Sequence, residues 1–281
     1  DYSNAPAALV VSIDRGRYRC FLDNGTAVTA TKARILGRKG VIVGDRVKLD
    51  GDVSGTAGSL ARIVEVEERR TWLRRSADDM DTFERPIVAN ADQLMIVTAL
   101  ADPEPRTGMI DRILVAAYDA QVSPILCLTK ADLASPDELR TAYAPLAIPI
   151  VAIRPGSDLS PVKSLLEHHM TVLIGHSGVG KSTLVNALVP GTGRATGAVS
   201  DVTGKGRHTS TSAAAISLPG GGWIIDTPGV RSFGISHVRA EAAGTTPPLR
   251  NALLTKPFAA ADSAQKDCSP SVGWSGPSPD G

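Results

Sequence analysis

The strongest chemical pattern in the chain is GHSGVGKS at residues 175–182, which fits the phosphate-binding motif GxxxxGK[ST]. Phosphates need several converging backbone N–H donors, and glycines let the backbone curl tightly enough to supply them. An apolar strand-like run precedes the motif and a helix-like run follows it, so the positive end of a helix would face the phosphates. We predict that Lys181 reaches the β- and γ-phosphates of a nucleotide and that the Ser182 hydroxyl ligates Mg²⁺.

Two further segments downstream suit the γ-phosphate and the metal. DTPG at residues 226–229 follows an apolar strand-like run, so Asp226 could hold the metal through a water and Gly229 could donate its N–H to the γ-phosphate. Between the motifs, residues 204–211 contain Thr209 and Thr211, and the hydroxyl of either could close over Mg²⁺. An ordinary polar loop is the alternative for this stretch.

A third pattern, TKAD at residues 129–132, resembles the NKxD element that reads guanine. Asp132 can accept hydrogen bonds from the ring N–H and the exocyclic amine of guanine, whereas adenine lacks this pair of donors. The presence of this carboxylate therefore argues against the interpretation of the chain as a general P-loop ATPase. The stem of Lys130 can cover the base. Thr129 stands where Asn is usual, so we expect the side-chain tie to the phosphate loop to be shortened or lost.

The order of these motifs is unusual, because the base-reading segment precedes the phosphate loop. A sheet tolerates such a rearrangement when the original termini lie close together, so we predict a circularly permuted GTPase. The residues expected to bind GTP or GDP are Thr129, Lys130, Ala131, Asp132, Gly175, His176, Ser177, Gly178, Val179, Gly180, Lys181, Ser182, Thr183 and Gly229. The residues expected to hold Mg²⁺ are Ser182, Thr209, Thr211 and Asp226.

The hydrolytic step needs a residue that orients the attacking water. Many GTPases use a Gln just after DTPG, but this chain has Val230 there. We take His208, in the loop before DTPG, as the replacement, which makes His208 and Lys181 the catalytic candidates. A role of His208 in loop structure or RNA contact is the alternative. The missing Gln also keeps open a second function, a GTP-regulated RNA-binding module with negligible turnover.

The elements around these motifs indicate two kinds of domain. In residues 93–239, strand-like apolar runs alternate with amphipathic helical runs, which predicts an α/β domain with a mostly parallel sheet. In residues 1–75, about five short β-rich runs separated by turn signals predict a small all-β barrel, with an OB-fold as the leading candidate. We expect residues 76–92 to be a linker and residues 240–281, rich in Ala, Gly, Pro, Ser and Thr, to be a disordered tail.

The charge is uneven along the chain. The whole sequence has a formal net charge of +1, but residues 1–75 carry 14 Lys and Arg against 9 Asp and Glu. This excess suits an anionic partner such as RNA, with a solvated charged face as the alternative. Tyr18 and Phe21, beside three arginines of the same strand region, could stack on single-stranded RNA, although Phe21 is better explained as core.

The bulk features indicate a reducing cytosol. The three cysteines lie far apart without a CxxC pair, which argues against a disulfide framework. No apolar run is long enough for a membrane helix, and the first residues lack the pattern of a signal peptide. We expect a cytoplasmic protein that does not associate with membranes.

Taken together, a basic OB-like region followed by TKAD, GHSGVGKS, GRHTST and DTPG resembles the ribosome small subunit-dependent GTPase A family, also called RsgA or YjeQ. The segments VGDRVKL, IVANADQLMIV and MIDRILVAA are similar too, and the resemblance covers about residues 8–236. It implies GTP hydrolysis stimulated by the small (30S) ribosomal subunit during late maturation, and rRNA contact through the OB-fold. We also expect a monomer.

Two departures from the family pattern concern zinc and the base. The family carries a zinc module built from three cysteines and a histidine, whereas the tail here has only Cys268 and no histidine after it. Since a structural zinc site needs four ligands, we predict none in this chain. The family backs the guanine with a Ser-Ala pair, and Ala152-Ile153 stands there instead.

Overall fold

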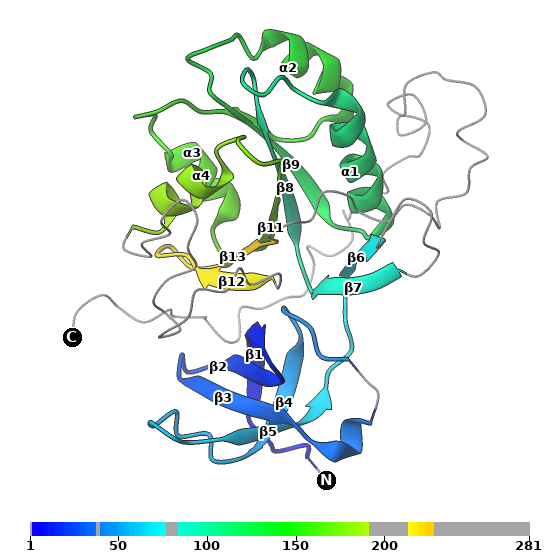
Figure 1. Cartoon of the computed structure of the whole chain (residues 1–281), viewed down its shortest axis with the longest axis vertical. Coiled ribbons are helices and arrows are strands. Elements are labelled where there is room, and N and C mark those ends of the chain that lie inside the picture. The colour runs from blue at the N-terminus through cyan, green and yellow to red at the C-terminus, as the bar shows by residue number, and fades with distance from the viewer. Residues whose placement is uncertain (1, 38–39, 77–83, 191–212, 228–281) are drawn as a thin grey trace, which may run out of the picture.

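The computed structural model describes residues 2–37, 40–76, 84–190 and 213–227. A small barrel of N-terminal strands lies beneath a larger α/β domain, and a short two-stranded sheet lies beside the passage between them (Figure 1). Among the described residues, no helix has the length and apolar character needed to cross a membrane. The predicted tail lies outside the described residues, as do the loop with His208 and the end of DTPG.

The barrel consists of β1 (Ala7–Asp14), β2 (Arg17–Leu22), β3 (Ala27–Lys32), β4 (Arg46–Gly51) and β5 (Ala61–Val66), with the short 3₁₀ helix η1 (Arg34–Leu36) after β3. The strands are ordered β1-β2-β3-β5-β4, and pairing of β1 with β4 closes the ring. Only β3 and β5 run parallel; the other pairs are antiparallel. Alternate side chains of the strands fill the interior, as in a small barrel. The predicted OB-like barrel is confirmed.

The α/β domain is built on a sheet ordered β10-β9-β8-β11-β13-β12, in which the first five strands run parallel. Its strands are β8 (Gln93–Ala99), β9 (Ser123–Thr129), β10 (Ile150–Ala152), β11 (Met170–Ile174), β12 (Ala214–Ser217) and β13 (Trp223–Asp226). Strand β12 pairs antiparallel with β13 and was not predicted. The mostly parallel sheet is confirmed.

Helices cover both faces of this sheet. They are α1 (Thr107–Asp119), α2 (Asp137–Tyr143) with the 3₁₀ turn η2 (Ala144–Leu146), α3 (Ser160–Leu166) and α4 (Lys181–Leu188). Helices α1 and α2 pack on one face, where they meet the β8 side chains of Leu94 and Ile96. Helices α3 and α4 pack on the other face against Met95 and Val97, since neighbouring residues of a strand point to opposite sides. The phosphate-loop segment is thus held between buried β11 and half-buried α4.

Two strands occupy the segment between the domains, where the sequence predicted only a connection. Strands β6 (Trp72–Ser76) and β7 (Glu84–Ala89) form a separate antiparallel sheet. Leu73 of β6 and Val88 of β7 are fully buried in the core beneath α1. The connection therefore packs on the α/β domain. The boundaries of the linker itself stay a prediction.

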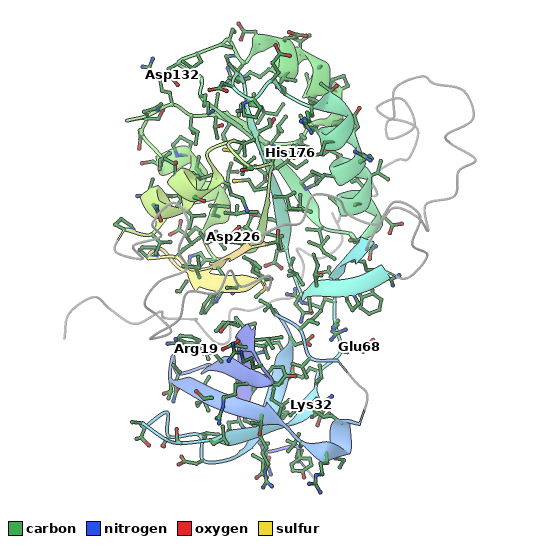
Figure 2. The ribbon with its side chains drawn as sticks, in the orientation of Figure 1. Arg19, Lys32, Glu68, Asp132, His176 and Asp226 are labelled. Atoms are coloured by element: carbon green, nitrogen blue, oxygen red, sulfur yellow. The ribbon has the colours of Figure 1, made fainter. Side chains whose placement is uncertain are left out.

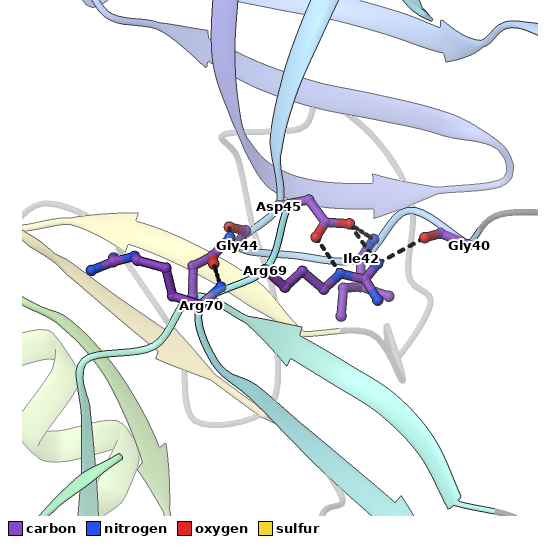
Figure 3. Close-up of polar contacts among 7 residues, drawn as sticks. Gly40, Ile42, Gly44, Asp45, Arg69 and Arg70 are labelled. Carbon is purple, nitrogen blue, oxygen red and sulfur yellow. Dashed lines mark hydrogen bonds and ion pairs between the residues drawn. The ribbon is translucent and has the colours of Figure 1, made fainter. Parts of the chain in front are cut away.

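A buried ion pair fixes the barrel to the chain that leaves it. The Asp45 side chain is fully buried and accepts two hydrogen bonds from the Arg69 guanidinium, at 2.7 and 2.9 Å (Figure 3). Asp45 also accepts the backbone N–H of Ile42, while Arg69 donates to the Gly40 carbonyl. Because all these groups find partners, the charges can be buried at the joint.

Asn90 adds a second tie at the same joint. Its side-chain NH₂ group donates to the Gly44 carbonyl, and its side-chain oxygen accepts the backbone N–H of Arg70. Gly44 has a φ of +90°, and a Cβ there would lie 2.0 Å from the carbonyl oxygen of Ala89. Only glycine allows this approach between the barrel and the end of β7.

The barrel also touches the far edge of the α/β sheet. Ser12 of β1 pairs with Ala214 of β12, so that strands of both domains join into one sheet. Beside this contact, the Phe21 ring of β2 packs edge-on against Trp223 of β13, with ring centroids 5.4 Å apart. Burial of Leu9 and Val11 in the same cluster makes this contact an apolar one.

Candidate nucleotide-binding site

The phosphate loop lies where the sequence predicted it, between the carboxyl end of β11 and the first turn of α4. Gly178 and Gly180 have φ of +82° and +88°, a conformation that favours glycine. A Cβ on Gly175 would lie 2.4 Å from the carbonyl oxygen of Val97, so the loop also needs a glycine where it leaves the sheet. The Val179 side chain is buried and anchors the loop from below.

The TKAD segment, which is predicted to read the base, lies beside the phosphate loop. Strand β9 ends at Thr129, whose hydroxyl donates a hydrogen bond of 2.5 Å to the Val179 carbonyl, with the Thr98 carbonyl 3.3 Å away. The side chain is buried, and the two loops it joins are 50 residues apart in sequence. Of the two outcomes expected for threonine at this position, the structure shows the shortened tie and not its loss. The backbones approach closely enough for the hydroxyl to reach.

Asp132 lies three residues beyond this tie, at the end of the α/β domain remote from the barrel (Figure 2). Its side chain is exposed, as a group that receives a ligand from solvent must be. Two backbone hydrogen bonds hold the segment. The Ala131 N–H donates to the Ile153 carbonyl, and the Ile153 N–H donates to the Leu128 carbonyl. The Ala152-Ile153 stretch thus supports TKAD through its backbone.

The loop after β8 also contacts the TKAD segment and the phosphate loop, which the sequence did not indicate. The Lys130 ammonium donates to the Asp102 carbonyl, and Pro103 lies within van der Waals reach of a Cβ built on Gly178. The only available signal was the position of this loop, since ligands in parallel sheets bind beyond the carboxyl ends of strands. The loops after β8, β9 and β11 therefore meet at one edge of the sheet.

Lys181 and Asp226 meet on the other side of the phosphate loop. The Lys181 ammonium lies 2.5 Å from a carboxylate oxygen of Asp226, at the end of β13, and both side chains are 15% exposed. Next to Asp226, the buried Thr227 hydroxyl donates to the Leu173 carbonyl and ties the ends of β13 and β11 together. The sequence paired neither residue with its partner.

Of the remaining predicted site residues, some lie within the described part of the chain and others do not. Ser182 and Thr183 lie exposed on the first turn of α4, while His176 and Ser177 belong to the loop itself. His208, Thr209, Thr211 and Gly229 lie outside the described residues. Within the described part of the chain, no three His, Cys, Asp or Glu side chains gather as a metal cluster.

One thiol lies near the site. Burial raises the pKa of Cys127, two residues before Thr129, to about 12. Cys127 is fully buried in the core, so its thiol stays protonated at neutral pH and packs as an apolar group.

The glycine-bounded loop between β11 and α4, with the TKAD segment placed beside it from earlier in the chain, defines a P-loop nucleotide-binding protein of the circularly permuted class. Comparison with known families is more specific. The family description "RsgA GTPase" matches residues 66–236, and the chain belongs to this family.

Curated relatives carry the same family name. The chain is 42% identical over 207 residues to the "Small ribosomal subunit biogenesis GTPase RsgA" of Azotobacter vinelandii, a match that covers 71% of this chain and 58% of the relative. A relative named "Small ribosomal subunit biogenesis GTPase RsgA 2", from Bacteroides thetaiotaomicron, is 38% identical, and the match covers 73% of this chain and 67% of the relative. The chain thus spans about 58% of the length of the first of these relatives.

Solved structures agree on the fold. YjeQ from Thermotoga maritima superposes with a TM-score of 0.60 and 28% identity, over 79% of this chain and 74% of that one. YloQ, described as a circularly permuted GTPase, superposes with a TM-score of 0.63 over 89% of this chain and 80% of that one. At 22% identity, the second likeness concerns the fold alone.

Proposed function

We propose that this protein hydrolyses GTP during late maturation of the small (30S) ribosomal subunit, that the subunit stimulates its turnover, and that the barrel contacts rRNA. The relatives' names supply the ribosomal part of the proposal. The observation that carries the nucleotide part is the Thr129 to Val179 hydrogen bond, because it brings a candidate purine reader and a phosphate loop to one edge of the sheet.

For guanine, we assign recognition to Asp132 and cover of the base to the Lys130 stem. A carboxylate within reach of the ring N–H and the exocyclic amine satisfies both donors at once. The same carboxylate would face no such pair on adenine. Backbone N–H groups of residues 175–183 would cradle the phosphates, aided by the positive end of α4.

For the phosphoryl chemistry, we assign Lys181 to the β- and γ-phosphates. A triphosphate offers Lys181 a denser negative charge than Asp226 does, so the pair would separate as Lys181 turns to the phosphates. Asp226 is then free to orient a metal-bound water, and the Ser182 hydroxyl to act as a direct ligand. This sparse set suits Mg²⁺, which keeps several waters and takes one or two carboxylates plus phosphate oxygens. Bound Mg²⁺ would neutralise charge that develops on the phosphates.

For residues 204–211 and for Gly229, the sequence alone supports our assignments. We keep Thr209 or Thr211 as the hydroxyl that closes over the metal, Gly229 as a γ-phosphate contact, and His208 as the group that orients the attacking water. We also place the protein in the cytoplasm, as a monomer that exchanges GTP and GDP.

Phosphate release tests the proposal directly. We expect the full chain to turn over GTP slowly alone and faster with purified small subunits, and Lys181→Ala to abolish both rates. Lys163→Ala, an exposed lysine on α3, is the matched control and should leave them unchanged. If subunits fail to stimulate release but bind differently with GTP and GDP, the protein is instead a GTP-regulated RNA-binding module.

A further inference from the structure

A cavity of about 500 Å³ opens on the barrel beside η1. We call it the basic cavity, and the lining residues that matter are Tyr2, Lys32, Arg34, Ile35, Asp50 and Arg62. Lys32 marks its place on the barrel in Figure 2. Its volume falls within the range of small-ligand sites, and nothing in the nucleotide site described above uses it.

The register of the strands connects this cavity to the outer face of the barrel. Arg17 of β2 lies opposite Thr31 of β3, Thr31 lies opposite Arg62 of β5, and Arg62 lies opposite Asp50 of β4. Directly opposed residues on one sheet face have neighbouring side chains. A row of side chains therefore runs from β2 across β3 into the cavity, along the face that OB-folds use for oligonucleotides.

The charges of the cavity favour an anion. Three cationic side chains line it, against the single carboxylate of Asp50. Asp50 pairs with Arg62 at 3.1 Å, but both side chains are about half exposed, so the pair is weak and Arg62 can exchange partners. The Lys32 ammonium donates to the Gly37 carbonyl at 2.9 Å, which holds it at the rim of the cavity.

Apolar and aromatic groups accompany these cations. The Ile35 side chain is 72% exposed, and the partly buried ring of Tyr2 lines the same cavity. On β2, Tyr18 packs partly into the barrel core and Phe21 packs edge-on against Trp223, and both side chains are partly buried. The lining of the cavity thus offers both an aromatic and an aliphatic side chain to a flat ring.

We infer that the basic cavity is a subsite for one unstacked nucleotide of single-stranded RNA, with its base against Tyr2 and Ile35 and its phosphate on Arg34, Arg62 and Lys32. This inference rests on the proposed rRNA contact of the barrel and specifies where on the barrel it occurs. Single strands can insert a base into such a site, whereas a duplex keeps its bases stacked and presents only its backbone.

Fluorescence anisotropy with a labelled single-stranded octauridine RNA tests the inference on the full chain. We expect Tyr2→Ala to weaken binding about 5- to 150-fold, the range for loss of one base–aromatic stack, and Tyr2→Phe to retain it. Arg34→Gln should lower the slope of log Kd against log salt by about 0.7, as for one lost phosphate contact. Arg46→Gln, a barrel arginine paired with Asp23 away from the cavity, is the matched control and should bind as the wild type.

Several outcomes would overturn the inference. These are no binding of octauridine, equal effects of Arg34→Gln and Arg46→Gln, no effect of Tyr2→Ala, or binding as tight to duplex RNA of the same length. Loss of subunit binding by Arg34→Gln with unchanged octauridine affinity would mean that the cavity contacts a protein. Subunit-stimulated phosphate release by the wild type, measured on the same preparations, reports on the proposed function separately.

Discussion

The hydrogen bond between Thr129 and Val179 leads to a prediction that tests whether this contact, and not only the TKAD sequence, supports nucleotide binding. Replacing Thr129 by Val keeps the side-chain shape but removes the hydroxyl, so the buried Val179 carbonyl loses the donor at 2.5 Å. A buried polar group without its partner costs about 1–3 kcal/mol. Part of this cost falls on folding, and part falls on the phosphate loop as it moves to find water.

We expect Thr129→Val to weaken GTP binding about 5- to 30-fold, which corresponds to about 1–2 kcal/mol. Thr129→Ser keeps the hydroxyl and should bind GTP within about twofold of the wild type. Thr129→Asn restores the usual residue of NKxD, but its longer side chain must fit where a Cβ built on Gly180 would lie 3.7 Å from Thr129. We therefore expect Asn to fall between Ser and Val.

Titration of a fluorescent GDP or GTP analogue measures these affinities, and thermal unfolding without nucleotide measures the share that falls on folding. A Val variant with wild-type affinity would show that the hydrogen bond does not position the loop. Equal losses in Val and Ser would show that the methyl packing, and not the hydroxyl, matters. Either result would refute the reasoning.

Three other predictions concern the base, the hydrolytic step and the joint. Asp132→Asn should shift preference from guanine to xanthine nucleotides, measured by competition; unchanged GTP preference would mean that TKAD is not the base site. His208→Ala should lower subunit-stimulated turnover without a change in GTP affinity; parallel losses in both would contradict its assigned role. Asp45→Asn should lower the free energy of unfolding in urea by about 3 kcal/mol, because it leaves Arg69 half-paired at a buried position. The exposed counterpart Asp23→Asn should change it by less than about 1 kcal/mol, and equal effects would refute the distinction.

The strands and helices that the sequence predicts correctly are those whose pattern of apolar residues matches their burial in the structure. The run at residues 93–100 reads as a buried strand, and β8 spans Gln93–Ala99 with six buried residues in seven. By contrast, β12 has four partly buried or exposed residues, so its pattern says little. It is a strand because β13 and β1 lie beside it, and such pairing depends on parts of the chain that are far apart in sequence.

In the candidate site too, the sequence predicts residue chemistry but not the distances between loops. Residue types and order predict which loops would bind phosphate and base, because only a few residue types suit those ligands. They could not indicate how closely the loops approach. Gly180 lies next to Thr129, and without a side chain it lets the backbones come near enough for a short hydroxyl to replace a longer amide. Likewise, nothing in the sequence paired Lys181 with Asp226 across 45 residues.

The position of β13 joins the nucleotide site to the barrel. Trp223 begins this strand and packs on Phe21 of the barrel, while Asp226 ends it and pairs with Lys181 of the phosphate loop. Three residue steps of extended chain separate the two ends, about 10 Å. Strands β11 and β12 pair with β13 on its two sides, so we expect the strand to stay straight between its ends. We therefore expect that a displacement of Asp226 on nucleotide binding would also act on the contact between Trp223 and the barrel, which is held to the α/β domain at Asp45 and Arg69 as well.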